Sequence, residues 1–394
     1  MSETKFWLIS PRDPLIFRNG KPFTAAPGSR AETLPIPYPG TISGAVRTKA
    51  WTDGATGVFD VHRINDPYNV HGPLLVELDA SDNIKDWLFI APADAVFFQT
   101  KEKSKTEADC FDLKPMPTLP GILLDSKDMV LCGFEKNIKR KSFKSPPTFW
   151  NWLTLKEWLF KPVSKRAVEL HTVGISHLPI EYRTHVAMEN SLQAAKDEGL
   201  YQTSAVEFDY KAPSGLTLND VRRFGMVAVC DLDIHGGGLG YLGGEKRLVD
   251  WLPIYTNVPF LTCPEDIRED IVNRGHCRLL MATPAYFGEK NDPEKALSAM
   301  GAEVIAIIND RFQTVSGWDY QTKKPKPTKH LVPAGSVFFL KLSDDLQKRN
   351  QFIDQVWGKN IGDDPQMCSD GYGLSLLGTW DGKKRRMNME ESDD

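Results

Sequence analysis

The stretch PEDIREDIVNRGHCRLLMATPAYF, residues 264–287, indicates the fold class because it joins a helix directly to a strand. PEDIREDIVNRG is the pattern of a capped helix, and CRLLMATPAYF is an apolar run that favours a strand. Further along, the sequence predicts strands at 302–310 and 334–342, a helix at 344–358 that ends on Gly358, and a last strand at 371–380.

The order of these elements predicts an α+β protein. With a strand at 224–234, they give strand, helix, strand, strand, helix, strand, which is the order of a split βαβ or ferredoxin-like sheet. One strand is surplus, since 302–310 and 334–342 compete for the middle position. We therefore expect two tandem ferredoxin-like, RRM-type domains with large insertions: a C-terminal domain over 216–394 and a heavily decorated N-terminal domain over 1–215.

The N-terminal half has weaker patterns. FWLI, residues 6–9, predicts a first strand, and the spacing after LPIPYPG predicts a first helix that begins at Gly40 to Thr41. Residues 86–100 are typical of a hairpin broken by Ala-Pro-Ala-Asp. Residues 101–147 have little periodicity and indicate an insertion or long loops, after which 150–159 predict an aromatic-rich helix.

Composition indicates a globular protein of more than one domain. Of 394 residues, 41% are hydrophobic and 25% are charged, and the formal net charge is -4 with a pI of about 6.1. A nucleic-acid contact would therefore come from local basic patches. The six cysteines form no CxxC pair, which favours a reducing cytoplasm over a disulfide framework. No apolar run reaches the length that spans a bilayer.

The strongest local pattern is HGGGLGYLGGEKR, residues 235–247, which has six glycines in nine positions. Because glycine has no Cβ, the backbone N–H groups of such a segment can approach a phosphate or a base closely, and Lys246 and Arg247 can neutralise charge. No GK[ST] follows, so it is not a Walker loop. The alternative is a flexible surface loop. The glycines concerned are Gly236, Gly237, Gly238, Gly240, Gly243 and Gly244.

Three weaker patterns could add to an RNA-binding site. The start of the first helix offers N–H groups and hydroxyls to phosphate, unless it is an ordinary capped helix. EYRTHVAMEN, from residue 181, predicts a projecting hairpin that could clamp single-stranded RNA, or else a strand edge protected by charges. Glycines that open the last strand are weak indications alone. The residues are Gly40, Thr41, Ser43, Arg47 and Lys49 in the helix, Arg183 and His185 in the hairpin, and Gly371, Gly373 and Gly378 in the last strand.

Catalytic and metal-binding patterns are weak. The eight histidines show no zinc spacing, and no serine lies in a GxSxG elbow. Asp231 and Asp233 could bind a metal, although a polar strand end explains them as well. The basic stretch 136–144 could touch RNA, but this stretch and the KKRR tail at 383–386 are more simply solvated segments. The sequence therefore predicts no catalytic residue, metal site or cofactor.

Several blocks run through nearly the whole chain and are informative in combination. They are PRDPLIFRNGKPF, PYPGTISGAVRTK, YRTHVAMEN with EGLYQT, GGGLGYLGGEKR, VPAGSVFFLKL and GYGLSLLGTW. Together they resemble the RAMP superfamily of CRISPR proteins, and most closely the Cmr-type subunit of the type III-B effector that holds the crRNA 5′ tag. Residues 101–147 match that family least.

The resemblance implies a non-catalytic RNA-binding subunit of a complex for antiviral defence. In that family, the glycine-rich loops and the first helix face the repeat-derived 5′ end of the guide, and a projecting hairpin disturbs the guide–target duplex beside the tag. The implied partners are crRNA, nearby target RNA, the large polymerase-like subunit and a backbone RAMP subunit, with no membrane.

Two other functions stay open. A RAMP endoribonuclease would use a histidine such as His62 or His185 for general acid–base cleavage of repeat RNA. A purely structural subunit would contact only protein.

Overall fold

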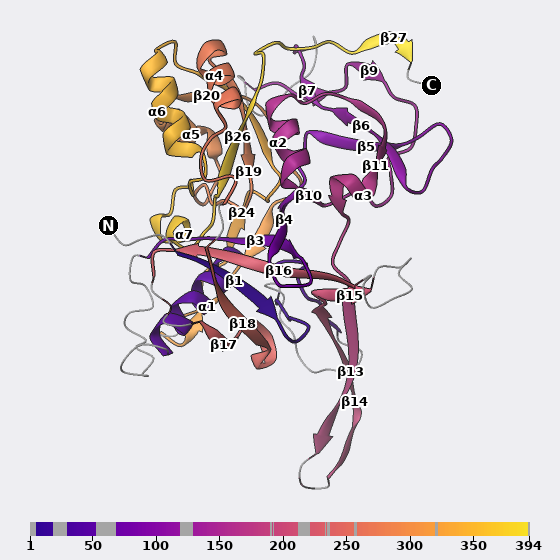
Figure 1. The fold of residues 1–394 in the computed structure, drawn as a ribbon, viewed down its shortest axis with the longest axis vertical. Coiled ribbons are helices and arrows are strands. Elements are labelled where there is room, and N and C mark those ends of the chain that lie inside the picture. The colour runs from indigo at the N-terminus through magenta and orange to yellow at the C-terminus, as the bar shows by residue number, and fades with distance from the viewer. Residues whose placement is uncertain are drawn as a thin grey trace. The chain divides into compact units, whose positions relative to one another are not determined.

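The computed structural model describes residues 5–18, 30–52, 68–118, 129–189, 191, 193–211, 221–232, 234, 237–255, 258–319 and 322–392. The chain forms two compact units (Figure 1). Unit 1 comprises 1–87, 177–255 and 314–329, and unit 2 comprises 88–176, 256–313 and 330–394. The units interleave along the chain, whereas the sequence predicted a division between 215 and 216. Helices combine with mostly antiparallel sheets, as the α+β class requires.

Unit 1 is built on an antiparallel sheet of four principal strands. They lie in the order β18 (Leu248–Ile254), β1 (Lys5–Pro11), β16 (Val221–Cys230) and β3 (Val70–Leu78). Counted along the chain, this order is fourth, first, third, second. Helix α1 (Pro39–Thr52) connects the first and second strands and packs against β3. Because β1 lies between two strands and is covered on both faces, its run Trp7, Leu8 and Ile9 is entirely buried.

The other elements of unit 1 extend this sheet or project from it. β17 (Gly238–Tyr241) pairs with β18 as the outermost strand, and β15 (Asp209–Lys211) pairs with β16. β13 (Ile180–Glu189) and β14 (Ala194–Val206) form the predicted hairpin, which Figure 1 shows extending away from the sheet of unit 1. β2 (Arg30–Ala31) runs parallel to β14, and β22 (Trp318–Asp319) pairs with β23 (Lys324–Pro325).

Unit 2 contains a four-stranded antiparallel sheet in the order β20 (Ala302–Ile308), β25 (Val337–Leu342), β19 (His276–Met281) and β26 (Ser375–Thr379). Along the chain these are the second, third, first and fourth strands, the same order as in unit 1 read from the other edge. α5 (Pro293–Ala299) connects the first pair and α6 (Leu346–Val356) connects the third strand to the fourth. The unit thus has the element order strand, helix, strand, strand, helix, strand.

This order resolves the surplus strand and corrects its assignment. The strand at 224–234 corresponds to β16, which belongs to unit 1, so the series in unit 2 begins at β19 instead. Both competing segments are used, because β20 is an edge strand and β25 lies between β20 and β19. The sequence analysis missed α5, which is only 7 residues long and depends on the Asp292 side chain as its N-cap.

A second part of unit 2 contains smaller sheets. β11 (Lys165–Glu169), β6 (Glu107–Asp112) and β5 (Ala95–Gln99) form a three-stranded one, and outside these smaller sheets β12 (Gly174–Ile175) pairs with β10 (Phe149–Asn151). The hairpin predicted at 86–100 is wrong, because residues 88–90 of β4 (Ile84–Ile90) pair with β10 while β5 pairs with β6. Two further pairs lie within the predicted insertion or connect it to the C-terminus: β7 (Lys114–Pro115) with β8 (Cys132–Gly133), and β9 (Lys136–Asn137) with β27 (Asn388–Ser392).

The remaining elements complete the chain. β21 (Gln313–Val315) and β24 (Lys329–Leu331), like β4, include residues of both units. The other helices of unit 2 are α2 (Trp152–Phe160), α3 (Leu170–Val173), α4 (Glu265–Arg274) and α7 (Pro365–Ser369). The predicted helix over 150–159 is present as α2, although Trp150 belongs to β10. None of the helices in the described ranges is long and apolar enough to cross a membrane.

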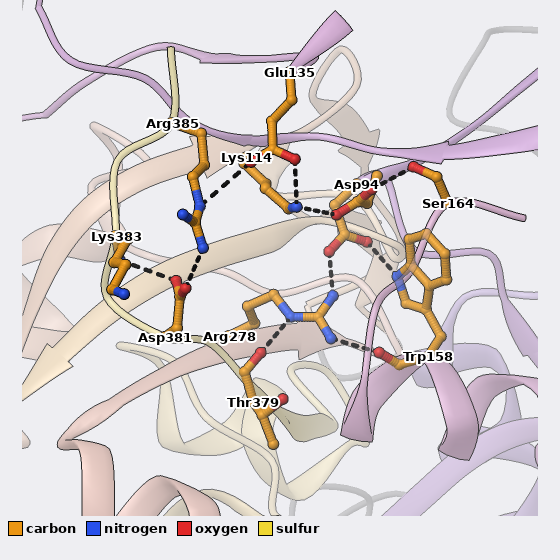
Figure 2. Close-up of polar contacts among 11 residues, drawn as sticks. Asp94, Lys114, Glu135, Trp158, Ser164, Arg278, Thr379, Asp381, Lys383 and Arg385 are labelled. Atoms are coloured by element: carbon orange, nitrogen blue, oxygen red, sulfur yellow. Dashed lines mark hydrogen bonds and ion pairs between the residues drawn. The ribbon is translucent and has the colours of Figure 1, made fainter. Parts of the chain in front are cut away.

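A buried polar network holds α2 and β26 against β19 in unit 2 (Figure 2). Arg278 of β19 pairs with Asp94 and donates to the backbone carbonyls of Thr379 at 2.9 Å and Trp158 at 2.6 Å. The indole N–H of Trp158 donates to Asp94 at 2.9 Å. Arg278 and Asp94 are almost fully buried. Arg278 therefore needs Asp94 and these carbonyls to offset its lost hydration, and Asp94 needs Arg278 and the Trp158 indole N–H.

Candidate nucleic-acid interface

The glycine-rich segment of unit 1 is an ordered part of the sheet. Gly238 to Tyr241 form β17, whose four residues all pair with β18, and a 3-10 turn at Gly244–Lys246 follows. We call residues 237–247 the glycine ledge. Gly236 and His235 lie outside the described residues. The alternative of a flexible surface loop does not fit a segment with this pairing.

Close packing explains why the glycine ledge needs glycine at three positions. A Cβ on Gly240 would lie 2.6 Å from Nε1 of Trp251, a buried residue of β18. Gly237 and Gly243 have φ angles of 68° and 76°, which side chains rarely adopt. A Cβ would lie 2.3 Å from the Trp251 carbonyl oxygen at Gly237, and 2.5 Å from the Ile16 carbonyl oxygen at Gly243. The ledge is therefore pressed onto β18 at one end and onto the segment that follows β1 at the other.

Helix α1 contacts the glycine ledge through Lys49. The Lys49 Nζ donates to the carbonyl oxygen of Leu239 at 2.9 Å, and this lysine is 8% exposed. Lys49 therefore stabilises the glycine ledge, and its side chain is almost entirely shielded from solvent.

Other predicted residues of α1 lie elsewhere. Ser43 and Arg47 are buried, so they are not surface residues of an interface. Thr41 is exposed and Gly40 half-buried at the start of the helix. The Thr41 N–H donates to the Tyr38 carbonyl, so this N–H is already engaged.

The exposed face of the glycine ledge carries Lys246, which the sequence analysis singled out, and two side chains that it did not, Leu239 and Tyr241. Leu239 and Tyr241 are 54% and 62% exposed, and Lys246 is also exposed. Arg247 donates to Glu245 at 2.9 Å and is mostly buried. The alternation in GLGY could have indicated these two side chains. In a strand, alternate residues face opposite sides, so Leu239 and Tyr241 lie on the face opposite to Gly240, which packs against Trp251.

The hairpin brings its two predicted residues onto one face. Arg183 and His185 are two positions apart in β13, and Arg183 donates to Glu181 at 2.8 Å. The His185 Nε2 lies 2.8 Å from the Thr203 hydroxyl oxygen, and its ring stacks on Tyr201 with centroids 5.2 Å apart. This face combines a cation with stacked rings, which suits contact with single-stranded RNA.

The glycines of the last strand have a packing role in unit 2. Gly371, Gly373 and Gly378 are all buried. A Cβ would lie 1.9 Å from the Ile361 carbonyl oxygen at Gly373, and 2.9 Å from the Leu159 carbonyl oxygen at Gly378. The ordinary explanation, a strand opened by glycines for close packing, accounts for Gly373 and Gly378, while Gly371 has a φ of 102° that side chains rarely adopt.

No candidate catalytic or metal centre emerges from the parts of the chain that the structure describes. Within them, no three His, Cys, Asp or Glu side chains are grouped as metal ligands. Asp231 accepts the Asn69 N–H at 3.0 Å, while Asp233 and His62 lie outside the described residues. Burial raises the pKa of Cys132 to about 12 and of Cys368 to about 11, so these thiols are poor nucleophiles at neutral pH.

Comparisons with known proteins agree over most of the chain. A model of the CRISPR-associated protein family Cas_Cmr3 matches residues 7–380. A chain in a cryo-EM structure of the type III-B Cmr-beta bound to cognate target RNA is 15% identical, with a TM-score of 0.47, over 93% of this chain and 95% of that one. A chain in a second such structure, with target RNA and AMPPnP in state 1, is 14% identical, with a TM-score of 0.42, over 89% and 94%. No curated protein matches. Because the family model spans nearly the whole sequence, this chain belongs to the CRISPR-associated Cas_Cmr3 family.

Proposed function

We propose that this chain is a non-catalytic crRNA-binding subunit of a type III-B CRISPR effector complex, and that the glycine ledge caps the repeat-derived 5′ tag of the guide. The observation that carries the proposal is the ordered structure of the glycine ledge, in a chain that belongs to the Cas_Cmr3 family. It is a strand and turn pressed onto Trp251 and Ile16, with its outer face exposed.

The physical properties of the glycine ledge suit an RNA end. Gly238 has no atom within 4 Å of a Cβ position, so a phosphate or base can approach its backbone closely. Lys246 supplies a positive charge, and the Tyr241 ring supplies a face for stacking. Because Lys49 and Trp251 already fix the segment, RNA binding would lose little conformational entropy of the protein.

The strand order supports tandem ferredoxin-like domains. Both units have the chain order fourth, first, third, second across their sheets. Unit 2 has α6 between its third and fourth strands. At the corresponding place in unit 1, the described residues between β16 and β18 form the glycine ledge in place of an α-helix. We therefore propose that unit 1 is a ferredoxin-like domain in which the second helix is replaced by an RNA-binding segment.

Further parts of the proposal concern partners. The hairpin face with Arg183, His185 and Tyr201 would lie near target RNA, beside the guide's tag. The subunit would contact the large polymerase-like subunit and a backbone RAMP subunit during antiviral defence. The six cysteines form no disulfide, in accordance with a cytoplasmic complex.

Binding to two labelled RNAs tests the proposal. One RNA carries the repeat-derived tag at its 5′ end, and the other carries the same nucleotides in scrambled order. The full chain should bind the tagged RNA more tightly, and Lys246→Glu should abolish that preference. Lys348→Glu reverses the charge of an exposed lysine on α6 and serves as the control. Equal affinity of the wild-type chain for both RNAs would refute tag recognition.

Labelled CRISPR repeat RNA distinguishes the endoribonuclease alternative. Incubation without metal should leave the repeat RNA intact. Specific cleavage that disappears in His185→Ala or His62→Ala would overturn the non-catalytic assignment, since general acid–base cleavage needs such a histidine.

A further inference from the structure

The C-terminal tail of unit 2 is held against the protein, although the sequence favoured a solvated terminus. The Arg385 N–H donates to the Pro115 carbonyl at 2.7 Å, and the Asn388 N–H donates to the Glu135 carbonyl at 2.8 Å. β27 then pairs with β9 in parallel, and Figure 1 shows the two elements close together. The basic tail at 383–386 therefore ends where the basic stretch at 136–144 begins.

Each basic segment is fixed by one inward-pointing arginine. Arg140 donates to Asp109 at 2.6 Å, and Arg385 pairs with Glu135 at 3.3 Å and also with Asp381 (Figure 2). Backbone bonds from β5 also hold the first segment, since the Gln99 N–H donates to the carbonyl of residue 141 at 2.9 Å. Both segments thus have defined positions in unit 2.

Seven other cations lie in these segments, and five of them point outward without an ion pair to a described residue. Lys141, Lys144, Lys383, Lys384 and Arg386 are exposed, and within the described part of the chain no ion pair engages them. We call these five residues the basic surface. Asn388 pairs with Lys136. Arg386 is two residues from Asn388, and Lys141 is five residues from Lys136. An extended chain of that length places Arg386 and Lys141 at most about 30 Å apart.

The local charge contrasts with that of the whole protein. Residues 135–144 contain five cations and one acid, and residues 381–386 contain four cations and one acid, so they sum to +7 in a chain of net charge -4. The two acids, Glu135 and Asp381, are already paired with Arg385. The nearest opposing charge in sequence is the acidic end, Glu390, Glu391, Asp393 and Asp394.

The composition of the basic surface favours a phosphate backbone over a protein partner. None of the large apolar side chains exposed in the described residues belongs to 136–144 or 381–388. Protein interfaces are enriched in aromatic residues and depleted in lysine at their centres, whereas RNA phosphates are contacted mainly by lysine and arginine. We propose that the basic surface is a second RNA-binding site, which holds the phosphate backbone of a single strand without reading its sequence.

The test uses the full chain, a labelled single-stranded RNA without repeat sequence, and anisotropy titrations over a range of salt. Lys383→Glu/Lys384→Glu/Arg386→Glu and Lys141→Glu/Lys144→Glu reverse the two halves of the surface and leave both anchoring arginines intact. Each lost phosphate contact should lower the slope of log affinity against log salt by about 0.7, so the triple variant should lose about 2. Lys141→Arg/Lys144→Arg should preserve binding.

The control matched to the triple variant is Lys290→Glu/Lys295→Glu/Lys348→Glu, which makes the same change in net charge as that variant at exposed positions elsewhere in unit 2. An equal loss in this control would overturn the proposal, because net charge alone would then explain the effect. Wild-type affinity and slope in both surface variants would overturn it as well, and so would loss of complex assembly with RNA binding intact. The surface variants should still bind the tagged RNA more tightly than the scrambled RNA, whereas Lys246→Glu should abolish that preference and leave the salt slope for RNA without repeat sequence unchanged, so the two RNA sites can fail independently.

Discussion

Alanine at Gly240 should destabilise unit 1 through one steric contact. The new Cβ would lie 2.6 Å from Nε1 and 2.9 Å from Cδ1 of Trp251, a residue that is 1% exposed and has little freedom to move. Forcing a methyl group into a packed core typically costs about 1–3 kcal/mol. We therefore expect Gly240→Ala to lower the free energy of unfolding by that amount and to weaken binding of the tagged RNA.

Two other glycines of the ledge provide an internal scale. A Cβ on Gly244 would meet its nearest atom, Cγ2 of Ile16, at an ordinary 3.5 Å, so Gly244→Ala should change stability by less than about 0.5 kcal/mol. Gly243 combines a φ of 76° with a clash at 2.5 Å, so Gly243→Ala should lose about 2–5 kcal/mol. The expected loss of stability therefore increases from Gly244→Ala through Gly240→Ala to Gly243→Ala.

Urea denaturation measures all three variants, and a second substitution checks the cause. Trp251→Phe removes the indole N–H edge that the new methyl group would meet. In the double variant with Gly240→Ala, the loss should be smaller than the sum of the two single losses by about 1 kcal/mol. Equal stability of Gly240→Ala and Gly244→Ala, or simple additivity in the double variant, would refute the steric explanation.

Two further predictions concern buried charges in unit 2. Asp94→Asn leaves Arg278 buried without its ion pair, so the free energy of unfolding in urea should fall by about 3–5 kcal/mol, and a loss below about 1 kcal/mol would contradict this. Burial would raise the pKa of Asp109, but the Ala167 N–H, Arg166 and Arg140 outweigh it and hold this pKa below its usual value. Asp109 therefore contributes stability above about pH 4 that is lost as the pH falls through its folded-state pKa. In thermal unfolding, the destabilisation by Asp109→Asn should be constant from about pH 7 to 5 and shrink below about pH 4. A destabilisation that does not depend on pH would contradict the assignment.

Local patterns were sufficient for several elements. The capped pattern of α4 predicted this helix close to its observed bounds. The apolar run predicted the start of β19, but the strand ends at Met281 rather than near Phe287. The glycines of the ledge also indicated a special backbone segment, because glycine in a strand reports close packing or backbone approach.

Pairing between distant segments was beyond local patterns. Nothing in the run at 224–230 states that β16 pairs with β1 and β3 rather than beginning the sheet of unit 2. The position of the C-terminal tail depends on the ion pair between Arg385 and Glu135, two residues that lie far apart in the sequence. The buried state of Ser43 and Arg47 likewise depends on tertiary packing, since the helix pattern alone does not say which face is covered.

Ultraviolet crosslinking of the native complex, followed by peptide mapping, addresses the tag-binding role of the glycine ledge. We expect adducts between nucleotides of the repeat-derived 5′ end and the peptide that contains Tyr241 and Lys246. Two results would contradict this role of the glycine ledge. One is a uniform 5′ end on the bound RNA whose tag forms adducts only with other subunits, and the other is the absence of any RNA adduct on this chain.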